Sequence, residues 1–174
     1  MRDEAAFVEF AEAVRGKLRR TAYLLCGDWD QASDHVQEGL IRVYVAWPRL
    51  TRAGREYAYA RKAVVSAFLD HSRRRSSTEV PAEPDRDVPS GQDIAESVAL
   101  RTALMSALTG LPSRQRACVV LRFFDDLSVA DTAAVLGCTE GTVKSQTSRA
   151  LASLRSTFEG SPIGGLAAEG ATPW

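Results

Sequence analysis

The 174-residue chain has few cysteines and histidines and no long apolar run. Its three cysteines are an odd number without C-x-x-C spacing, which argues against a disulfide framework and a structural zinc site. No segment approaches the ~20 apolar residues that span a bilayer, and the acidic start at Asp3 and Glu4 is unlike a secretory signal. We therefore expect a cytoplasmic protein with reduced thiols, no metal, no cofactor and no membrane insertion.

Strand-like alternation of apolar and polar residues is almost absent, whereas apolar residues recur with a period of about 3.6 in both halves of the chain. A hydrophobic content of 45% and a charged content of 25% are typical of a globular protein with a buried core. These features predict an all-α protein. The expected helices cover residues 4–26, 28–47, 54–75, 94–109, 112–124, 128–136 and 139–158, with Pro48 ending the second helix.

The net charge of zero conceals an uneven distribution of 22 basic and 22 acidic side chains. An acidic segment with three prolines, from Ser76 to Gln92, separates two basic segments and has the composition of a linker. We therefore predict two small helical domains joined by a flexible linker. The predicted units are a first domain over residues 1–76, a linker over 77–93, a second domain over 94–158 and a flexible tail over 159–174.

The composition of the linker also bears on how the two domains are arranged. Because the linker offers little apolar surface, we expect partners, rather than contact between the domains, to set their relative position. The alternative is a closed arrangement in which the acidic linker covers basic side chains.

The helix expected over residues 28–47 has an apolar stripe and an opposite, polar face with Asp34, Gln37, Glu38 and Arg42. Ile41 and Val45 stand in the middle of that polar face. Apolar side chains ringed by charges are typical of a docking surface for another protein. Two incidentally exposed aliphatic residues are the alternative.

The helix expected over residues 54–75 has a basic face. Residues 49–75 carry eight basic and two acidic side chains, and the outward side brings together Arg55, Tyr59, Lys62, Ser66 and Arg73. An aromatic ring among cations suits single-stranded nucleic acid, since cations meet phosphates and the ring stacks on an unpaired base. The alternative is that the arginines at residues 73–75 only favour a helix C-terminus.

The second domain contains the signature of a helix-turn-helix. Ser128 and Asp131 have capping-box spacing, Gly137 supplies a stop, and Thr139 caps a new helix after a short turn. Polar side chains line the outward N-terminal half of that last helix, where a major groove would lie: Lys144, Ser145, Ser148 and Arg149, with Gln146 at the flank. Arg114 and Arg116 of the preceding helix are expected to hold phosphates. A plain helical hairpin is the alternative.

Four segments resemble the extracytoplasmic-function (ECF, group IV) sigma factors of the sigma-70 family. Two of them are similar to region 4 of that family: L-P-S-R-Q-R-A-C-V-V-L-R-F-F-D-D-L-S (111–128) and G-T-V-K-S-Q-T-S-R-A-L-A-S-L-R (141–155). A third segment is similar to region 2.2: D-Q-A-S-D-H-V-Q-E-G-L-I-R-V-Y (30–44). The fourth is similar to regions 2.3 and 2.4: A-R-K-A-V-V-S-A-F-L-D-H-S-R-R-R (60–75). The resemblance covers nearly all of the chain outside the linker and tail.

The resemblance implies a promoter-specificity subunit that binds core RNA polymerase and performs no catalysis. Its implied partners are the β′ clamp helices and β flap of the polymerase and promoter DNA, with an anti-sigma factor left open as a further partner. The candidate core-binding residues are Asp34, Gln37, Glu38, Ile41 and Arg42. The candidates for the minus-10 element are Arg55, Tyr59, Lys62, Ser66, Asp70, Arg73 and Arg74, and those for the minus-35 element are Arg114, Arg116, Thr142, Lys144, Ser145, Gln146 and Arg149.

Three positions depart from the family pattern. Ser66 stands where the family usually has Asn, Gln146 where Arg is common, and Thr147 where an apolar residue is common. We therefore expect the promoter sequence to differ from that of relatives. Two rival functions are a stand-alone helix-turn-helix transcriptional regulator and a helical adaptor or enzyme. The second lacks support, because His35 and His71 have no partner pattern for catalysis.

Overall fold

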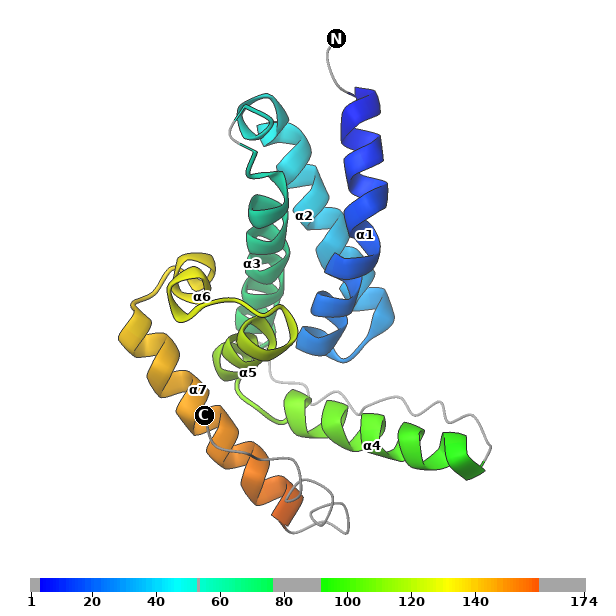
Figure 1. The fold of residues 1–174 in the computed structure, drawn as a ribbon, viewed down its shortest axis with the longest axis vertical. Coiled ribbons are helices and arrows are strands. Elements are labelled where there is room, and N and C mark those ends of the chain that lie inside the picture. The colour runs from blue at the N-terminus through cyan, green and yellow to red at the C-terminus, as the bar shows by residue number, and fades with distance from the viewer. Residues whose placement is uncertain (1–3, 53, 77–91, 160–174) are drawn as a thin grey trace.

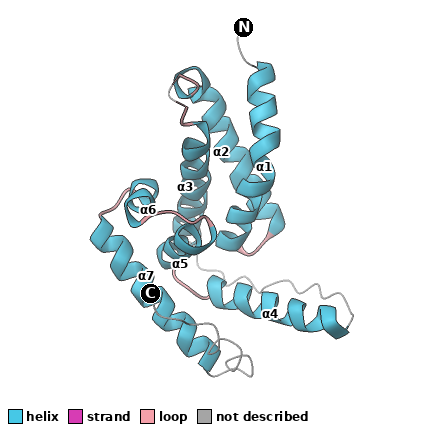
Figure 2. Cartoon of the chain, viewed as in Figure 1, coloured by secondary structure: helices cyan, strands magenta, loops and turns pink. Residues whose placement is uncertain are grey.

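The computed structural model describes residues 4–52, 54–76 and 92–159, except for the side chains of 92–97. Over these residues the chain forms seven α-helices and one π-helical turn and no strand, which confirms the all-α prediction (Figure 2). The elements are α1 (Glu4–Cys26), α2 (Trp29–Leu50), α3 (Glu56–Ser76), α4 (Gln92–Thr109), α5 (Ser113–Val119), η1 (Val120–Phe124), α6 (Val129–Leu136) and α7 (Glu140–Glu159). The expected linker and tail lie almost wholly outside the described residues.

Helices α1, α2 and α3 pack as a bundle and form the first structural unit (Figure 1). Their apolar stripes meet in a core that includes Leu18, Val43 and Val64, all fully buried. At the end of the bundle where α1 begins, aromatic rings pack together. The ring centres of Phe7 and Phe10 of α1 lie 5.3 and 5.2 Å from that of Trp47. The stripe predicted on the second helix is therefore the core of this unit.

The start of α2 is fixed by a side-chain cap. Gly27 leaves α1 with a φ of 79°, and the Asp28 carboxylate accepts hydrogen bonds from the backbone N–H groups of Asp30 and Gln31 at 2.9 and 2.7 Å. The end of α2 was predicted wrongly. Pro48 lies inside the helix, which continues to Leu50.

The helix tolerates Pro48 because the proline removes only one hydrogen bond near the C-terminus. The carbonyl that loses its partner belongs to Tyr44, whose side chain is exposed, so water can reach that side of the helix. The last turn is closed by the backbone N–H of Thr51, which donates to the Trp47 carbonyl at 3.1 Å.

The helix predicted over residues 112–124 is also not continuous. Only α5 is α-helical, and the chain then widens into the π turn η1, where the Asp125 N–H donates to the Val120 carbonyl at 3.0 Å. The wider turn directs Val120 and Leu121 into the protein interior, whereas Phe123 and Phe124 stay exposed. Asp126, which follows, has a φ of 52°, an uncommon conformation for a residue other than glycine.

The two structural units pack against each other, contrary to the expectation that only partners would position them. Helix α6 contacts α3, α5 contacts both α1 and α3, and η1 contacts α1 (Figure 1). Leu25 of α1 and Val65 and Phe68 of α3 are buried in one cluster with Val120 and Leu121 of η1. The expectation failed because it considered only the linker, whereas the contact is made by the helices themselves.

Two kinds of feature are absent from the described residues. No helix there has the length and apolar character needed to cross a membrane. No group of three or more histidine, cysteine or acidic side chains in that part of the chain is placed to hold a metal ion.

Candidate protein and nucleic-acid interfaces

The outer face of α2 has the properties that the sequence predicted. Ile41 and Val45 expose 57% and 76% of their surface, and acidic and amide side chains flank them in the open. The exposed flanking residues are Asp34, Gln37 and Glu38, while Arg42 is half-buried. Because a side chain as apolar as Val45 gains nothing from water, this patch is suited to being covered by another protein.

An apolar groove between α1 and α2 adjoins this face, and sequence reasoning missed it. The groove has a volume of about 750 Å³, and Val8, Ile41 and Tyr44 line it. Val8 and Tyr44 are 47% and 53% exposed, so the apolar surface extends from α2 onto α1. The signal was present in the sequence as Phe7 and Val8, two adjacent apolar residues of which only one can point into the core.

Charged side chains connect α2 to α3 at their outer surfaces. The Arg42 guanidinium pairs with Glu38 one turn earlier and lies 3.8 Å from the Asp70 carboxylate on α3. Asp70 in turn accepts from Arg73 at 2.7 Å. Arg42, predicted to bind core polymerase, and Asp70, predicted to bind the minus-10 element, thus belong to one exposed network of ion pairs. The contribution of such a network to stability is small.

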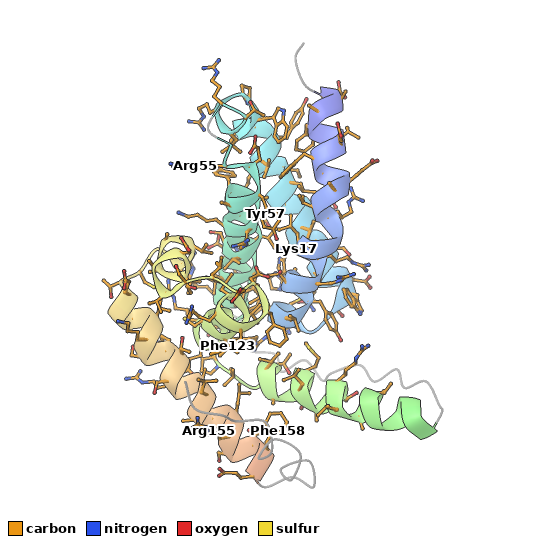
Figure 3. All side chains as sticks on the ribbon, viewed as in Figure 1. Lys17, Arg55, Tyr57, Phe123, Arg155 and Phe158 are labelled. Atoms are coloured by element: carbon orange, nitrogen blue, oxygen red, sulfur yellow. The ribbon has the colours of Figure 1, made fainter. Side chains whose placement is uncertain are left out.

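Helix α3 presents the predicted basic face. Arg55, Tyr59 and Lys62 are exposed, Ser66 is half-buried between the turns that carry Lys62 and Asp70, and Arg73 and Arg74 are exposed near the C-terminus. Arg55 lies at the end of α3 farthest from α5 (Figure 3), so this face runs the length of the helix. Arg61 points the other way and is only 12% exposed, so it does not belong to the outward cations.

The helix-turn-helix is built from the caps that the sequence predicted. The Ser128 hydroxyl accepts from the Asp131 N–H at 2.9 Å, Gly137 has a φ of 61°, and the Thr139 hydroxyl accepts from the Thr142 N–H at 3.1 Å. Helix α7 then buries Val143 and Ala150.

The outward surface of α7 is polar, as predicted. Lys144, Ser145 and Arg149 are exposed, and Gln146 is half-buried at the flank. Thr142 is half-buried, and its hydroxyl lies 2.9 Å from that of Thr139, so it contributes to the cap. The exposed cations and hydroxyls therefore lie on the first three turns of α7, where a helix end would enter a major groove.

Arg116 is not placed for the predicted phosphate contact. Its guanidinium is turned inward and donates to the carbonyls of Leu25, Thr109 and Leu111 at 2.5, 2.6 and 2.9 Å. Burial lowers the pKa of Arg116 from its ordinary value. Arg114, in contrast, is exposed. Nothing in the sequence distinguished the two arginines, because only the packing of α5 against α1 makes one of them internal.

These features define a helical protein with a helix-turn-helix in one unit and an exposed apolar patch beside a basic helix in the other. Two family models match such a chain: sigma-70 region 2 over residues 10–78 and sigma-70 region 4 over residues 101–154. The RNA polymerase sigma-E factor of Streptomyces avermitilis is 38% identical over 167 residues, which cover 93% of this chain and 92% of that protein. The ECF RNA polymerase sigma factor SigM of Mycobacterium tuberculosis is 33% identical, with 87% and 76% covered.

The chain belongs to the extracytoplasmic-function group of the sigma-70 family and is an RNA polymerase sigma factor. This family consists of transcription initiation factors. A solved structure supports the fold: the sigma factor RpoE of Bartonella quintana, in complex with the anti-sigma factor NepR, superposes with a TM-score of 0.68 at 23% identity and covers 89% of this chain and 98% of its own.

Proposed function

We propose that this sigma factor docks on core RNA polymerase through the outer face of α2 and recognises two promoter elements, the minus-10 element with α3 and the minus-35 element with α7. The observation that carries the proposal is the exposure of Ile41 and Val45 among acidic side chains, in a chain that also has a helix-turn-helix. A stand-alone regulator would not need such a patch on its other unit. Since polymerase and chromosomal DNA are its partners, we place its action in the cytoplasm.

The polymerase-docking face combines two kinds of contact. Ile41 and Val45 would be desolvated by the partner, and each side chain can contribute ~1.5 to 3 kcal/mol on full burial. The carboxylates of Asp34 and Glu38 lie on the same face and would select a basic surface on the partner. We assign this face to the β′ clamp helices.

The α3 face is suited to a melted strand. Arg55 and Lys62 can neutralise phosphates, and the ring of Tyr59, 36% exposed, lies between them along the helix. Ser66 offers one hydroxyl where relatives present an amide, so its reach toward a base is shorter.

Helix α7 is assigned to the duplex of the minus-35 element. Arg149 is the residue proposed for base recognition and Lys144 for the phosphate backbone. Ser145 donates its hydroxyl to the Thr142 carbonyl at 3.0 Å, which leaves the oxygen lone pairs outward as acceptors. Arg114 remains a candidate phosphate contact, whereas Arg116 is removed from the set.

The proposal is tested by reversing charge on the docking face. The double substitution Asp34→Arg with Glu38→Arg should abolish binding to core polymerase in a pull-down while the thermal melt by circular dichroism stays close to wild type, because both side chains are exposed. A matched control is Glu9→Arg with Glu12→Arg, two exposed acids on α1 that do not line the groove. If the two double variants bind polymerase equally well, the assignment of the docking face is wrong.

A further inference from the structure

One side chain on the outer face of α2 and one on the basic face of α3 have a charge opposite to that of their neighbours. Among the candidate core-binding residues, Arg42 is the cation, whereas Asp34 and Glu38 are acids. Among the candidate residues for the minus-10 element, Asp70 is the acid in a set with four cations. These two exceptions contact each other, because Nη2 of Arg42 lies 3.8 Å from Oδ2 of Asp70.

Neither charge suits the partner proposed for its own helix. A cation within an acidic docking face weakens the attraction to a basic surface on the partner. A carboxylate on a helix that faces DNA repels the phosphates. When the two side chains pair, each offsets the charge of the other, so the contact between them accounts for both exceptions.

The close packing of α2 against α3 brings this pair together (Figure 1). Gly39, less than one turn before Arg42, permits the approach of the two helices, since a Cβ there would lie 2.6 Å from Cγ2 of Val64. Side chains of a helix point toward its N-terminus, and the Arg42 guanidinium accordingly lies between Glu38 and Asp70. The Arg42 side chain is 36% exposed, so much of it is covered by the protein itself rather than free for a partner.

The two oxygens of the Asp70 carboxylate serve different cations. Oδ1 accepts a hydrogen bond from Nη2 of Arg73 at 2.7 Å, while Oδ2 faces Arg42. The Arg73 side chain is 80% exposed, so one corner of its guanidinium is held and its other N–H groups are open to a phosphate. With Arg42 beside it, Asp70 can orient Arg73 without leaving a net negative charge next to the DNA.

We propose that Arg42 is a positioning residue for recognition of the minus-10 element: it neutralises Asp70, which orients Arg73 toward the DNA backbone, and it contacts neither polymerase nor DNA itself. The inference rests on the proposed function for the partners of α2 and α3. It moves Arg42 from the core-binding residues to those that serve promoter recognition. Loss of the Arg42 charge therefore affects a step that follows polymerase binding.

The test compares Arg42→Met, which keeps a long side chain and removes its charge, with Arg42→Lys, which keeps the charge. Titration of the full chain with core polymerase measures affinity. Permanganate reactivity then measures strand opening by the saturated holoenzyme on fragments of its own genome that the wild type transcribes. We expect Arg42→Met to bind polymerase as tightly as wild type and to lower the equilibrium constant for opening about three- to fivefold, the size of effect of one exposed ion pair. Arg42→Lys should restore most of the opening.

A second substitution shows whether Arg42 acts through Asp70. In a chain that already carries Asp70→Asn, Arg42→Met should have no further effect on opening, because the charge that it neutralises is gone. The matched control Arg20→Met removes an exposed cation of α1 that lies outside the faces assigned above. It should leave both polymerase binding and strand opening unchanged.

Unchanged opening with Arg42→Met would overturn the positioning role, and so would weaker polymerase binding with normal opening at saturation, which would return Arg42 to the docking face. An equal loss of opening with and without Asp70→Asn would overturn it as well, since Arg42 would then act on DNA independently of Asp70. A wild type that binds polymerase but opens no fragment would contradict the proposed function, and this role with it. Circular-dichroism melts check the fold of each variant, and Arg42→Gln takes the place of Arg42→Met if the methionine variant melts below wild type.

Discussion

Alanine in place of Gly39 or Gly16, which lie in two different helices, should change the free energy of unfolding in opposite directions. Gly39 lies in α2 against α3, and a Cβ added there would be 2.6 Å from Cγ2 of Val64 and 3.1 Å from its backbone nitrogen. Gly16 lies in α1, where an added Cβ meets nothing within 4 Å. Alanine at residue 39 therefore tests the close approach of α2 and α3, the two helices proposed to hold the polymerase and the minus-10 strand.

The magnitudes follow from two opposing terms. Alanine is better than glycine in a helix interior by ~1 kcal/mol, and this gain applies at both positions. At residue 39 the extra methyl group must also displace Val64, which is fully buried, and overpacking of this kind costs ~1 to 3 kcal/mol. We expect Gly16→Ala to raise the free energy of unfolding by ~0.5 to 1 kcal/mol and Gly39→Ala to lower it by up to ~2 kcal/mol.

Urea denaturation followed by circular dichroism measures both free energies of unfolding. The double variant Gly39→Ala with Val64→Ala removes the methyl group that clashes, so its cost should be smaller than the sum of the two single costs. Equal stabilisation by alanine at residues 16 and 39 would show that α2 and α3 are not packed as described here.

Four further substitutions test individual side chains. Arg116→Ala should lower the free energy of unfolding, measured by urea denaturation, by ~2 to 4 kcal/mol, because three carbonyls lose a charged donor. The same substitution should leave the salt dependence of DNA binding unchanged, and an altered salt dependence would show that Arg116 contacts phosphates. Burial and, to a smaller extent, the nearby His71 lower the pKa of His35, so the unfolded chain binds a proton more readily than the folded chain as the pH falls below ~6.5. The free energy of unfolding should therefore fall with the pH, by at most ~1.4 kcal/mol per pH unit. The substitution His35→Leu should flatten this slope, and an unchanged slope would contradict the assignment. Arg149→Ala should cost ~1 to 3 kcal/mol at one base pair and relax preference there, whereas Lys144→Ala should weaken binding to every promoter variant; identical effects in a mobility-shift series would mean that the base and phosphate assignments are mixed up.

Local signals in the sequence predicted most of the fold. Helix caps depend on residues within three positions of each other, so Asp28, Ser128 and Thr139 could be identified from spacing alone. The outward faces of α2 and α7 could be predicted because helix geometry fixes which side chains oppose the apolar stripe. The proline in α2 was misjudged because a proline near a helix end costs less than one in its middle.

The features that the sequence did not predict depend on contacts between distant segments. Val64 and Val65 are adjacent and both fully buried, which requires α3 to be covered on two sides, by α2 and by the second unit. In the sequence, Arg61 is one of several cations in a basic segment. In the structure it lies beside Asp125, which is far along the chain. No local pattern specifies such a pair, because its geometry exists only after both units have folded.

The central claim is that this chain directs core RNA polymerase to promoters. Run-off transcription on a library of upstream fragments from its own genome, with core polymerase alone and with core polymerase plus the chain, tests it most directly. We expect discrete transcripts from a subset of fragments that appear only with the chain and disappear with the Asp34→Arg, Glu38→Arg double variant. A chain that binds DNA fragments by itself but yields no transcript above core polymerase alone would contradict the account and favour a stand-alone DNA-binding regulator.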